Sequence, residues 1–421
     1  MNRSRDMRPR RVLYVVSMFP CLSETFIVRE IEQLIERGVD VHIVSLKRCS
    51  QSIVQSSAAA LMPRVLQPVG WRTSLRGLAQ ALVSRRGPLG TCVAGLVGGL
   101  WRQPVVLGKT LVALWRTLGV LGEIERFDPD LVHAHWATYP SSIAWCVRIL
   151  LDVPFSFTSH AHDIFVEDQM LARKLAEAAL SVTISEFNVR YLTSRHGQAW
   201  APGQLQVIHC GVDRRRLPDP AQAADREEGL VVCVGRLDPI KGFDVLIRAL
   251  AQLKGCAVDF RCVIVGEGPL RHPLERLREE LGLGSCIEMP GAMPQEQVQS
   301  LMARASVFVM PSVVTPEGNR DGIPVALMEA MAGEAAVVAT RVSGIPELVA
   351  DGVTGLLVEP DDAQALSRAM RRLLTDPVLR SRLGASGRGH VLESFEVSVQ
   401  TERLLSHFSR ALMQRTPHHV G

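Results

Sequence analysis

Short apolar runs alternate with amphipathic stretches along most of this chain, and this alternation constrains the fold more than any other feature. Amphipathic segments such as Ser23–Arg37, which ends at the helix-stopping Gly38, predict helices between the runs. Strands that alternate with helices predict βαβ units and a parallel, doubly wound sheet. In the first half, the strand-like runs are Val12–Val16, Val41–Ser45, Leu131–His133, Pro154–Thr158, Leu180–Ile184 and Gln206–Ile208.

A second alternation follows a break in the pattern. Residues 214–229 carry charge and proline without an apolar period, which is typical of a linker. The strand-like runs beyond it are Leu230–Val234, Arg261–Val265, Cys286–Glu288, Ser306–Met310 and Ala336–Ala339. The helices expected between them are Phe243–Leu253, Pro269–Leu281, Glu296–Ala303 and Pro324–Ala332. At 421 residues the chain is also longer than one hydrophobic core usually organises.

The expected architecture is therefore two tandem Rossmann-like α/β domains that face each other across a cleft. We place the first domain at residues 1–213, the linker at 214–229 and the second domain at 230–395. The amphipathic stretch Val397–Leu412 predicts a helix within residues 396–421, and we expect this helix to pack back on the first domain.

The cysteines and the N-terminus indicate the expected compartment. All nine cysteines are scattered singly without a CxxC pair, which predicts reduced thiols rather than a disulfide framework. The basic stretch Arg3–Arg11, followed by Val12–Val16, weakly resembles a secretory signal. Its apolar run has only about five residues, whereas such signals need about 7–15, so a first strand is the better interpretation. We expect a cytoplasmic protein.

Charge is distributed very unevenly. Residues 41–122 contain no Asp or Glu but ten Lys and Arg, so this window carries +10 in a chain whose net charge is +4. Trp71, Trp101 and Trp115 lie among these cations, together with many leucines and valines. Basic helices with such residues on their other face are typical of proteins that lie on an anionic membrane surface.

The expected partner of residues 71–122 is therefore an anionic membrane, on the inner face of the plasma membrane. The uncharged, glycine-rich run Gly87–Trp101 has about fifteen residues and is shorter than the ~20 that span a bilayer. An ordinary buried helical pair with a solvated basic face stays open as the alternative. We expect no nucleic acid partner, because the cations are not clustered with base-stacking aromatics.

A polar loop, Thr315–Gly322, leads from a predicted strand into a predicted helix. It places Asp321 just ahead of the helix and Glu329 about a turn and a half inside it, with Pro324 at the first helical position. The start of such a helix offers free amides and a positive dipole end to a diphosphate, and a carboxylate inside it can reach ribose hydroxyls. The alternative, which spacing alone favours, is that Asp321 caps the helix and Glu329 is a solvated charge.

A second candidate phosphate site is the segment 235–242, which follows the first strand of the second domain. Arg236 and Lys241 lie there at the carboxyl edge of the predicted sheet, where ligands bind in open α/β folds. The arginine fork and the lysine point charge suit a pair of phosphates. No Walker loop occurs, and the later Gly266-Glu267-Gly268 is interpreted as a tight turn.

Two HxH pairs lie in the first domain, His133 with His135 and His160 with His162. The members of such a pair share a face of a strand and can ligate zinc, which leaves a metallohydrolase as an alternative. We prefer a structural role for His133 and His135, because in hydrolases of that type the HxH strand opens the fold. His162 and Asp163 end a strand, where a site residue would lie, and their role stays open.

Together, several segments resemble the family-4 retaining glycosyltransferases of the GT-B fold. Those in the second domain are Val234-GRLDPIKGFDVLIRAL, Val265-GEGPL, Val309-MPS, Asp321-GIPVALMEAMA and Ser343-GIPELVADGVTG. Those in the first domain resemble the exopolysaccharide, colanic-acid-type branch of the family: Phe19-PCLSETFIVREI, Val132-HAHWAT, Thr158-SHAHDIF and Val182-TISEFNVRYL. The resemblance extends from about residue 11 to about residue 395.

The resemblance implies transfer of a sugar from a nucleotide diphosphate sugar, with retention at the anomeric carbon and without a required metal or other cofactor. Arg236 and Lys241 match the cations that neutralise the leaving diphosphate. Glu329 matches the second acid of the family's E-x7-E motif, which holds the nucleotide ribose. The residues expected to line the same nucleotide site are Gly266, Gly322, Ile323 and Pro324.

The chain departs from the family pattern at Asp321, which stands where the first acid of the motif is usually Glu. That acid faces the donor sugar, and an aspartate reaches about one bond less; Glu317 could substitute, although it lies four residues too early. His162 matches a first-domain histidine that approaches the donor sugar. With Arg236 and Lys241, Asp321 and His162 complete the expected catalytic set.

On the acceptor side, the resemblance places Glu24 and Thr25 in the loop after the first strand, and the expected acceptor is a lipid-linked or polysaccharide chain. Two other functions stay open. A non-hydrolysing sugar-nucleotide epimerase has the same two-domain architecture. A catalytically silent sugar-nucleotide-binding subunit is also possible, because the first acid of the motif is altered.

Overall fold

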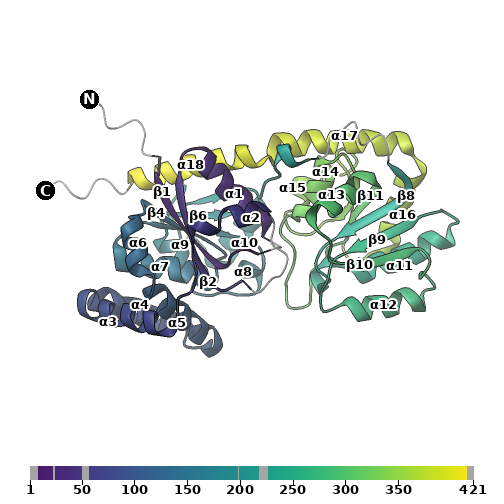
Figure 1. The fold of residues 1–421 in the computed structure, drawn as a ribbon. Coiled ribbons are helices and arrows are strands. Elements are labelled where there is room, and N and C mark those ends of the chain that lie inside the picture. Colours follow the sequence, from purple (N-terminus) through teal and green to yellow (C-terminus); the bar gives the residue numbers. More distant parts are fainter. Residues whose placement is uncertain (1–7, 22–23, 50–55, 198, 218–225, 415–421) are drawn as a thin grey trace, which may run out of the picture. The chain divides into compact units, whose positions relative to one another are not determined.

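The chain folds into two compact units in the computed structural model, which describes residues 8–21, 24–49, 56–197, 199–217 and 226–414 (Figure 1). The first unit comprises Met1–Ile184, Val189–His209 and Gln400–Gly421, and the second comprises Ser185–Asn188 and Cys210–Val399. Each unit is built on one parallel sheet. This confirms the prediction of two tandem α/β domains.

The sheet of the first unit has seven strands in the order β3-β2-β1-β4-β5-β6-β7. The strands are β1 (Arg11–Met18), β2 (Asp40–Lys47), β3 (Val65–Leu66), β4 (Leu131–His135), β5 (Phe155–Ser159), β6 (Leu180–Thr183) and β7 (Leu205–Val207). The strand order reverses between β1 and β4, so the loops that follow these two strands border a switch point, where ligands bind in open α/β folds.

Helices connect the strands of the first unit. They are α1 (Thr25–Glu36), α2 (Ser56–Ala60), α3 (Trp71–Ser84), α4 (Arg86–Leu100), α5 (Pro104–Leu118), α6 (Leu121–Phe127), α7 (Tyr139–Leu151), α8 (His162–Phe165), α9 (Leu171–Glu177) and α10 (Glu186–His196). No single helix among the described residues is long and apolar enough to cross a membrane; α5 and α6 meet the length and composition requirement only as a pair, with a bend of 59° between them.

The C-terminal helix α18 (Val397–Gln414) packs on the first unit, as predicted (Figure 1). Its buried residues Leu404, Leu405 and Phe408 share one hydrophobic cluster with Tyr14 of β1 and Ile31 of α1. An amphipathic stripe of this kind is what stabilises a helix against a core.

The sheet of the second unit has six strands in the order β10-β9-β8-β11-β12-β13. They are β8 (Glu227–Val234), β9 (Arg261–Val265), β10 (Ile287–Gly291), β11 (Ala305–Met310), β12 (Ala336–Thr340) and β13 (Leu356–Val358). Its helices are α11 (Phe243–Gly255), α12 (Arg271–Glu280), α13 (Gln295–Arg304), α14 (Val325–Ala332), α15 (Ile345–Leu348), α16 (Ala363–Thr375) and α17 (Pro377–Ser394). Here the order reverses between β8 and β11.

The segment predicted as a linker differs from that prediction at both of its ends. Arg214–Arg216 form a short 3-10 turn, and β8 begins at Glu227, so residues 227–229 belong to the sheet. Polar residues open this strand, which concealed its start in the sequence. Residues 218–225 lie outside the described part of the chain.

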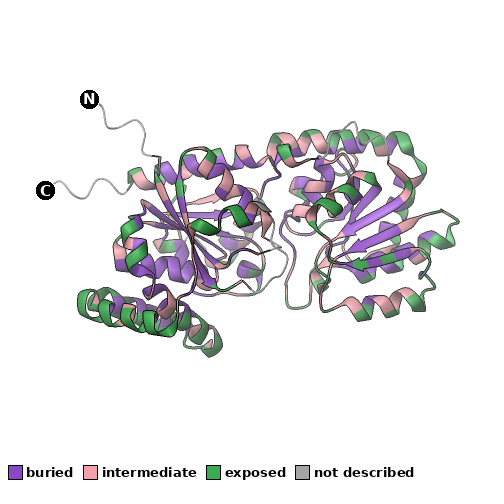
Figure 2. Ribbon diagram, viewed as in Figure 1, coloured by how far each residue is buried: buried purple, intermediate pink, exposed green. Residues whose placement is uncertain are grey.

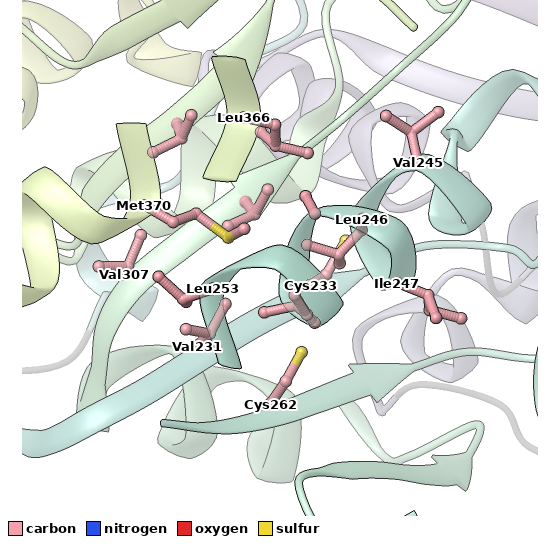
Figure 3. Close-up of a cluster of buried hydrophobic side chains, with 14 of the residues drawn as sticks. Val231, Cys233, Val245, Leu246, Ile247, Leu253, Cys262, Val307, Leu366 and Met370 are labelled. Atoms are coloured by element: carbon pink, nitrogen blue, oxygen red, sulfur yellow. The ribbon is translucent and has the colours of Figure 1, made fainter. Parts of the chain in front are cut away.

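One face of the second sheet is covered by α11 and α16, whose apolar side chains meet those of β8 and β11 (Figure 3). Leu246 and Met370 pack there over Val231 and Cys233, all of them buried.

Burial also raises the pKa of the Cys233 and Cys262 thiols, so both stay protonated. All nine cysteines lie in the described part of the chain, and none of them is in a disulfide there. Figure 2 shows that the central strands of both sheets are largely buried, and β4, β5, β11 and β12 are buried at every residue.

Candidate functional site

The loops after β8, β9 and β11 are packed tightly together at the carboxyl edge of the second sheet. Gly266, at φ +150°, lies so close to the loop after β8 that a Cβ on it would stand 1.8 Å from the Gly235 carbonyl oxygen. Gly242, at φ +62°, is equally confined, since a Cβ on it would stand 2.0 Å from the Pro311 carbonyl oxygen. Only glycine fits at these two positions, and the loops that carry the predicted phosphate residues are thereby fixed against each other.

Two of the predicted site residues are in direct contact. The Lys241 ammonium lies 2.8 Å from one carboxylate oxygen of Asp321, and the Ser312 hydroxyl donates to the other oxygen at 2.5 Å. The Ser312 carbonyl in turn accepts a hydrogen bond from the Thr340 hydroxyl of β12. Ser312 and Asp321 are buried, and the Lys241 side chain is only 16% exposed. The carboxylate therefore anchors the ammonium to the sheet.

Arg236 differs from Lys241 in its exposure. Its side chain is 71% exposed, and its guanidinium lies 3.6 Å from the Asp238 carboxylate. Arg236 is the second residue after β8, in the same loop as Lys241. This edge of the sheet thus carries one anchored cation and one cation that faces solvent, an arrangement that suits a diphosphate.

Helix α14 begins at Val325, one residue later than predicted. Pro324 is its N-cap residue, with ψ 125°, so the prediction that Pro324 occupies the first helical position is wrong by one residue. No side chain caps this helix, because the Asp321 carboxylate bonds Lys241 and Ser312 instead. The alternative in which Asp321 acts as a helix cap is therefore wrong.

The other predicted nucleotide residues lie along the same segment. Gly322, Ile323 and Pro324 are buried, and Ile323 packs into the hydrophobic cluster under α14. Glu329 is half-buried on α14 and accepts a hydrogen bond of 3.3 Å from the Gln295 amide of α13.

In the first unit, the predicted residues lie in the segments that follow β1 and β5. Glu24 precedes α1, and its carboxylate accepts a hydrogen bond of 3.0 Å from the Trp136 indole. Burial raises the pKa of Glu24 to about 6, although His135 and the indole oppose this shift. Thr25 is the first residue of α1. His162 is the first residue of α8; its side chain is half exposed, 3.5 Å from the Glu167 carboxylate.

His133 is bonded on both ring nitrogens. Nδ1 lies 2.8 Å from the Ser156 hydroxyl and Nε2 lies 3.0 Å from the Thr158 hydroxyl, both on the neighbouring strand β5. Burial lowers the pKa of His133 to about 3, so its ring is neutral. These contacts are those of a structural histidine.

His135 continues this network toward α1. Its Nε2 lies 3.0 Å from the Glu30 carboxylate, which also accepts from the Tyr14 hydroxyl at 2.6 Å, and its Nδ1 lies 3.1 Å from His160. Ligand atoms of Glu30, His133 and His135 lie within 4.8 Å of one another, close enough to hold a metal ion. Since both nitrogens of each of these two rings already have protein partners, a metal would have to replace those hydrogen bonds.

Acidification is expected to destabilise the first unit. The unfolded chain takes up a proton on His133 near pH 6.5, whereas the folded protein resists it until about pH 3, so stability falls as the pH falls between these values. The expected loss is about 1.4 kcal/mol per pH unit. Thermal unfolding of wild type and His133→Gln between pH 7 and 4.5 measures it. If the free energy of unfolding of the variant fell as steeply with pH as that of wild type, His133 would not be the group responsible.

Both halves of the chain match known glycosyltransferases. Residues 23–216 match the family described as Glycosyltransferase Family 4, and residues 216–390 match Glycosyl transferases group 1. A Salmonella typhimurium protein assigned as a colanic acid biosynthesis glycosyltransferase, WcaL, is 31% identical over 85% of this chain and 89% of its own length. The amylovoran biosynthesis glycosyltransferase AmsK of Erwinia amylovora is 28% identical over 86% of this chain and 90% of its own length.

A GDP-mannose-dependent phosphatidylinositol monomannoside mannosyltransferase of Mycolicibacterium smegmatis is 35% identical over 59% of this chain and 68% of its own length. Among solved structures, sucrose-phosphate synthase of Thermosynechococcus elongatus has a TM-score of 0.70 at 21% identity, with 95% of this chain and 99% of that chain covered. Anabaena HepE in complex with UDP and glucose has a TM-score of 0.65 at 18% identity, with 95% and 100% covered. These similarities confirm the predicted fold class.

Proposed function

The chain belongs to the family-4 glycosyltransferases and transfers a sugar in glycan synthesis; from this premise we propose that its donor is a nucleotide diphosphate sugar, that it retains the anomeric configuration and that it requires no metal. The observation that supports the proposal is the pair of cations at the edge of the second sheet. There Lys241, anchored by Asp321, and the exposed Arg236 come from one loop, beside the segment that opens α14.

The chemistry follows from these residue types. As the bond between the anomeric carbon and the diphosphate breaks, negative charge builds on the leaving oxygen. Arg236, Lys241 and the free amides at the start of α14 stabilise that charge without transferring a proton. The acceptor hydroxyl attacks the same face of the sugar, and its proton passes to the departing phosphate oxygen. Because the side chains meet the charge of the diphosphate, no step in this scheme needs a metal.

The remaining predicted residues have positions that suit this reaction. Glu329 is proposed to hold the ribose, with Gly266, Gly322, Ile323 and Pro324 around the nucleotide. His162, half exposed after β5, is proposed to approach the donor sugar. Asp321 is proposed to act on the same site by holding the Lys241 ammonium in place.

The test is a screen of UDP-, GDP- and dTDP-sugars with the full chain, and GDP-mannose is a natural first donor in view of the mannosyltransferase relative. A bound donor is expected to raise the thermal midpoint, and hydrolysis or transfer releases the nucleoside diphosphate. Activity should survive a chelator. An epimerase would convert the donor sugar without an acceptor, whereas a silent subunit would bind the donor without turnover.

The acceptor is proposed to be a lipid-linked or polysaccharide chain, which the protein meets as a peripheral protein on the cytoplasmic face of the membrane. The helix α3 supports this. Its buried side is made of small residues, Ser74 and Ala81, and a Cβ on Gly77 would stand 2.1 Å from the Leu118 carbonyl oxygen of α5. The helix thus packs closely through its small side.

A different side of α3 carries the large apolar residues. Trp71, Leu75 and Leu82 are spaced to form one stripe, and each is more than half exposed. Arg72 and Arg76 lie next to this stripe and are exposed as well. An ordinary surface helix buries its large apolar residues, so this reversed arrangement suits a lipid surface with anionic headgroups.

Binding to anionic vesicles is expected to need both the apolar stripe and the arginines beside it. Replacing Arg72 and Arg76 of α3, together with the exposed Arg86 that begins α4, with Gln should weaken binding by roughly 10²-fold, at about 1 kcal/mol for each cation. Replacing Trp71, Leu75 and Leu82 with Ser should also weaken it. Sedimentation with phosphatidylcholine vesicles, with and without phosphatidylglycerol, measures both effects.

The matched control replaces three exposed arginines of α16 with Gln, namely Arg368, Arg371 and Arg372. Arg85 is left intact because its guanidinium bonds the Glu125 carboxylate and the Leu150 carbonyl, so it belongs to the fold. Equal loss of binding in the α16 control and in the α3 variants would indicate attraction by net charge alone.

A further inference from the structure

The loop after β4 has an unusual backbone. Trp136 adopts φ 76°, in the left-handed region that a bulky side chain rarely occupies. The loop lies at the switch point of the first sheet, since β4 neighbours β1 and the strand order reverses there. Strained residues of this kind persist only where the surrounding structure holds them, and they gather at functional sites.

Two buried ionisable side chains hold this loop. The Asp163 carboxylate accepts from the Ala137 amide at 2.6 Å, and the Lys174 ammonium donates to the carbonyl oxygens of Ala137 and Thr138. Asp163 and Lys174 have no exposed surface, and burial lowers the pKa of Lys174 to about 7. Burying both groups is costly, so the shape of the loop is maintained against a considerable desolvation penalty.

The loop presents the Trp136 indole beside a carboxylate. The indole N–H donates to Glu24 at 3.0 Å, and the ring lies 4.5 Å from the His160 ring, while the side chain stays partly exposed. An aromatic ring offers an apolar surface to the C–H groups of a sugar, and a carboxylate accepts hydrogen bonds from its hydroxyls. The pair comes from the two loops that border the switch point.

We propose that Trp136 and Glu24 form the acceptor-saccharide subsite of the first unit, with Asp163 and Lys174 as positioning residues that hold the loop in its binding shape. The inference rests on the proposed transferase function and adds to it a sugar-contacting tryptophan and its support. A site held rigid before binding does not lose affinity to the ordering of its loop.

The test compares Trp136→Ala and Trp136→Phe with wild type, with Trp200→Phe as control at another half-buried tryptophan of the first unit. The probes are octyl glycosides of glucose, galactose, mannose and fucose. Donor hydrolysis without a glycoside should keep its rate and donor KM in both Trp136 variants. The glycoside KM should rise roughly tenfold or more in Trp136→Ala and less in Trp136→Phe, which keeps the ring.

The variant Lys174→Met tests whether Lys174 acts by holding the loop after β4 in its binding shape. Since Lys174 lies too deep to touch a sugar, a rise in glycoside KM with unchanged donor hydrolysis would show that it acts through the loop. A lower thermal midpoint alone, without this KM change, would make it merely structural. The subsite is overturned if folded Trp136→Ala keeps the wild-type glycoside KM, or if wild type hydrolyses a donor but neither glycosylates nor saturably binds any of the probes. Failure of wild type to bind any nucleotide sugar would instead overturn the proposed function.

Discussion

Replacement of Lys241 with Ala is expected to reduce sugar transfer by roughly 10²–10³-fold, the usual effect of removing one preorganised group that stabilises developing charge. The ammonium is fixed before any ligand arrives, because Asp321 holds it at 2.8 Å and Ser312 holds Asp321. A fixed charge loses no free energy to reorganisation as the diphosphate departs. Steady-state rates with the donor found in the nucleotide-sugar screen measure the effect.

The variant also leaves the Asp321 carboxylate without its cation, which by itself destabilises the second unit. The double variant Lys241→Ala with Asp321→Asn removes that unpaired charge. It should recover most of the thermal midpoint but not the rate. Lys254→Ala is the matched control, since that lysine is exposed on α11 and bonds only the Gly282 carbonyl among the contacts described. Wild-type turnover in Lys241→Ala would remove this phosphate site.

The fold was largely predictable because parallel strands that are buried on both faces appear in the sequence as continuous apolar runs. Val12–Val16 and Ala336–Ala339 are of this kind, and both are buried strands. The strands β3 and β13 were missed because two or three residues carry too little pattern. The start of β8 was assigned to the linker because Glu227 and Glu228 open the strand.

The site was predictable only in part, because its contacts join residues far apart in sequence. The positions of Lys241 and Asp321 at one sheet edge followed from the strand pattern, but not the ion pair between these residues, which lie eighty positions apart in the sequence. Nor did the sequence distinguish Lys174 from an ordinary charge on an amphipathic helix, although its ammonium is buried under the loop after β4. For α3, composition indicated a basic, apolar helix, and only the packing of Gly77 on α5 reveals which side is exposed.

Asp321 is the residue at which sequence and structure lead to different roles. The resemblance places its carboxylate toward the donor sugar, as the first acid of the E-x7-E motif. In the structure, one oxygen bonds the Lys241 ammonium and the other accepts from Ser312. The aspartate places one oxygen on each of these two partners, and a glutamate would be longer by one bond. The shorter residue thus suits an anchor for Lys241 better than a direct contact with the sugar.

Asp321→Asn is accordingly expected to lower kcat by roughly 10–10²-fold, because the ammonium loses its anchor. Binding of the free nucleoside diphosphate should not weaken, since a negative charge is removed beside the phosphates. The affinities for nucleoside diphosphate and nucleotide sugar, measured by calorimetry, should therefore change by the same factor. Ser312→Ala, which keeps both charges, should show a smaller effect in the same direction. If Asp321 instead holds the sugar, Asp321→Asn weakens the nucleotide sugar selectively while nucleoside diphosphate binding is unaffected.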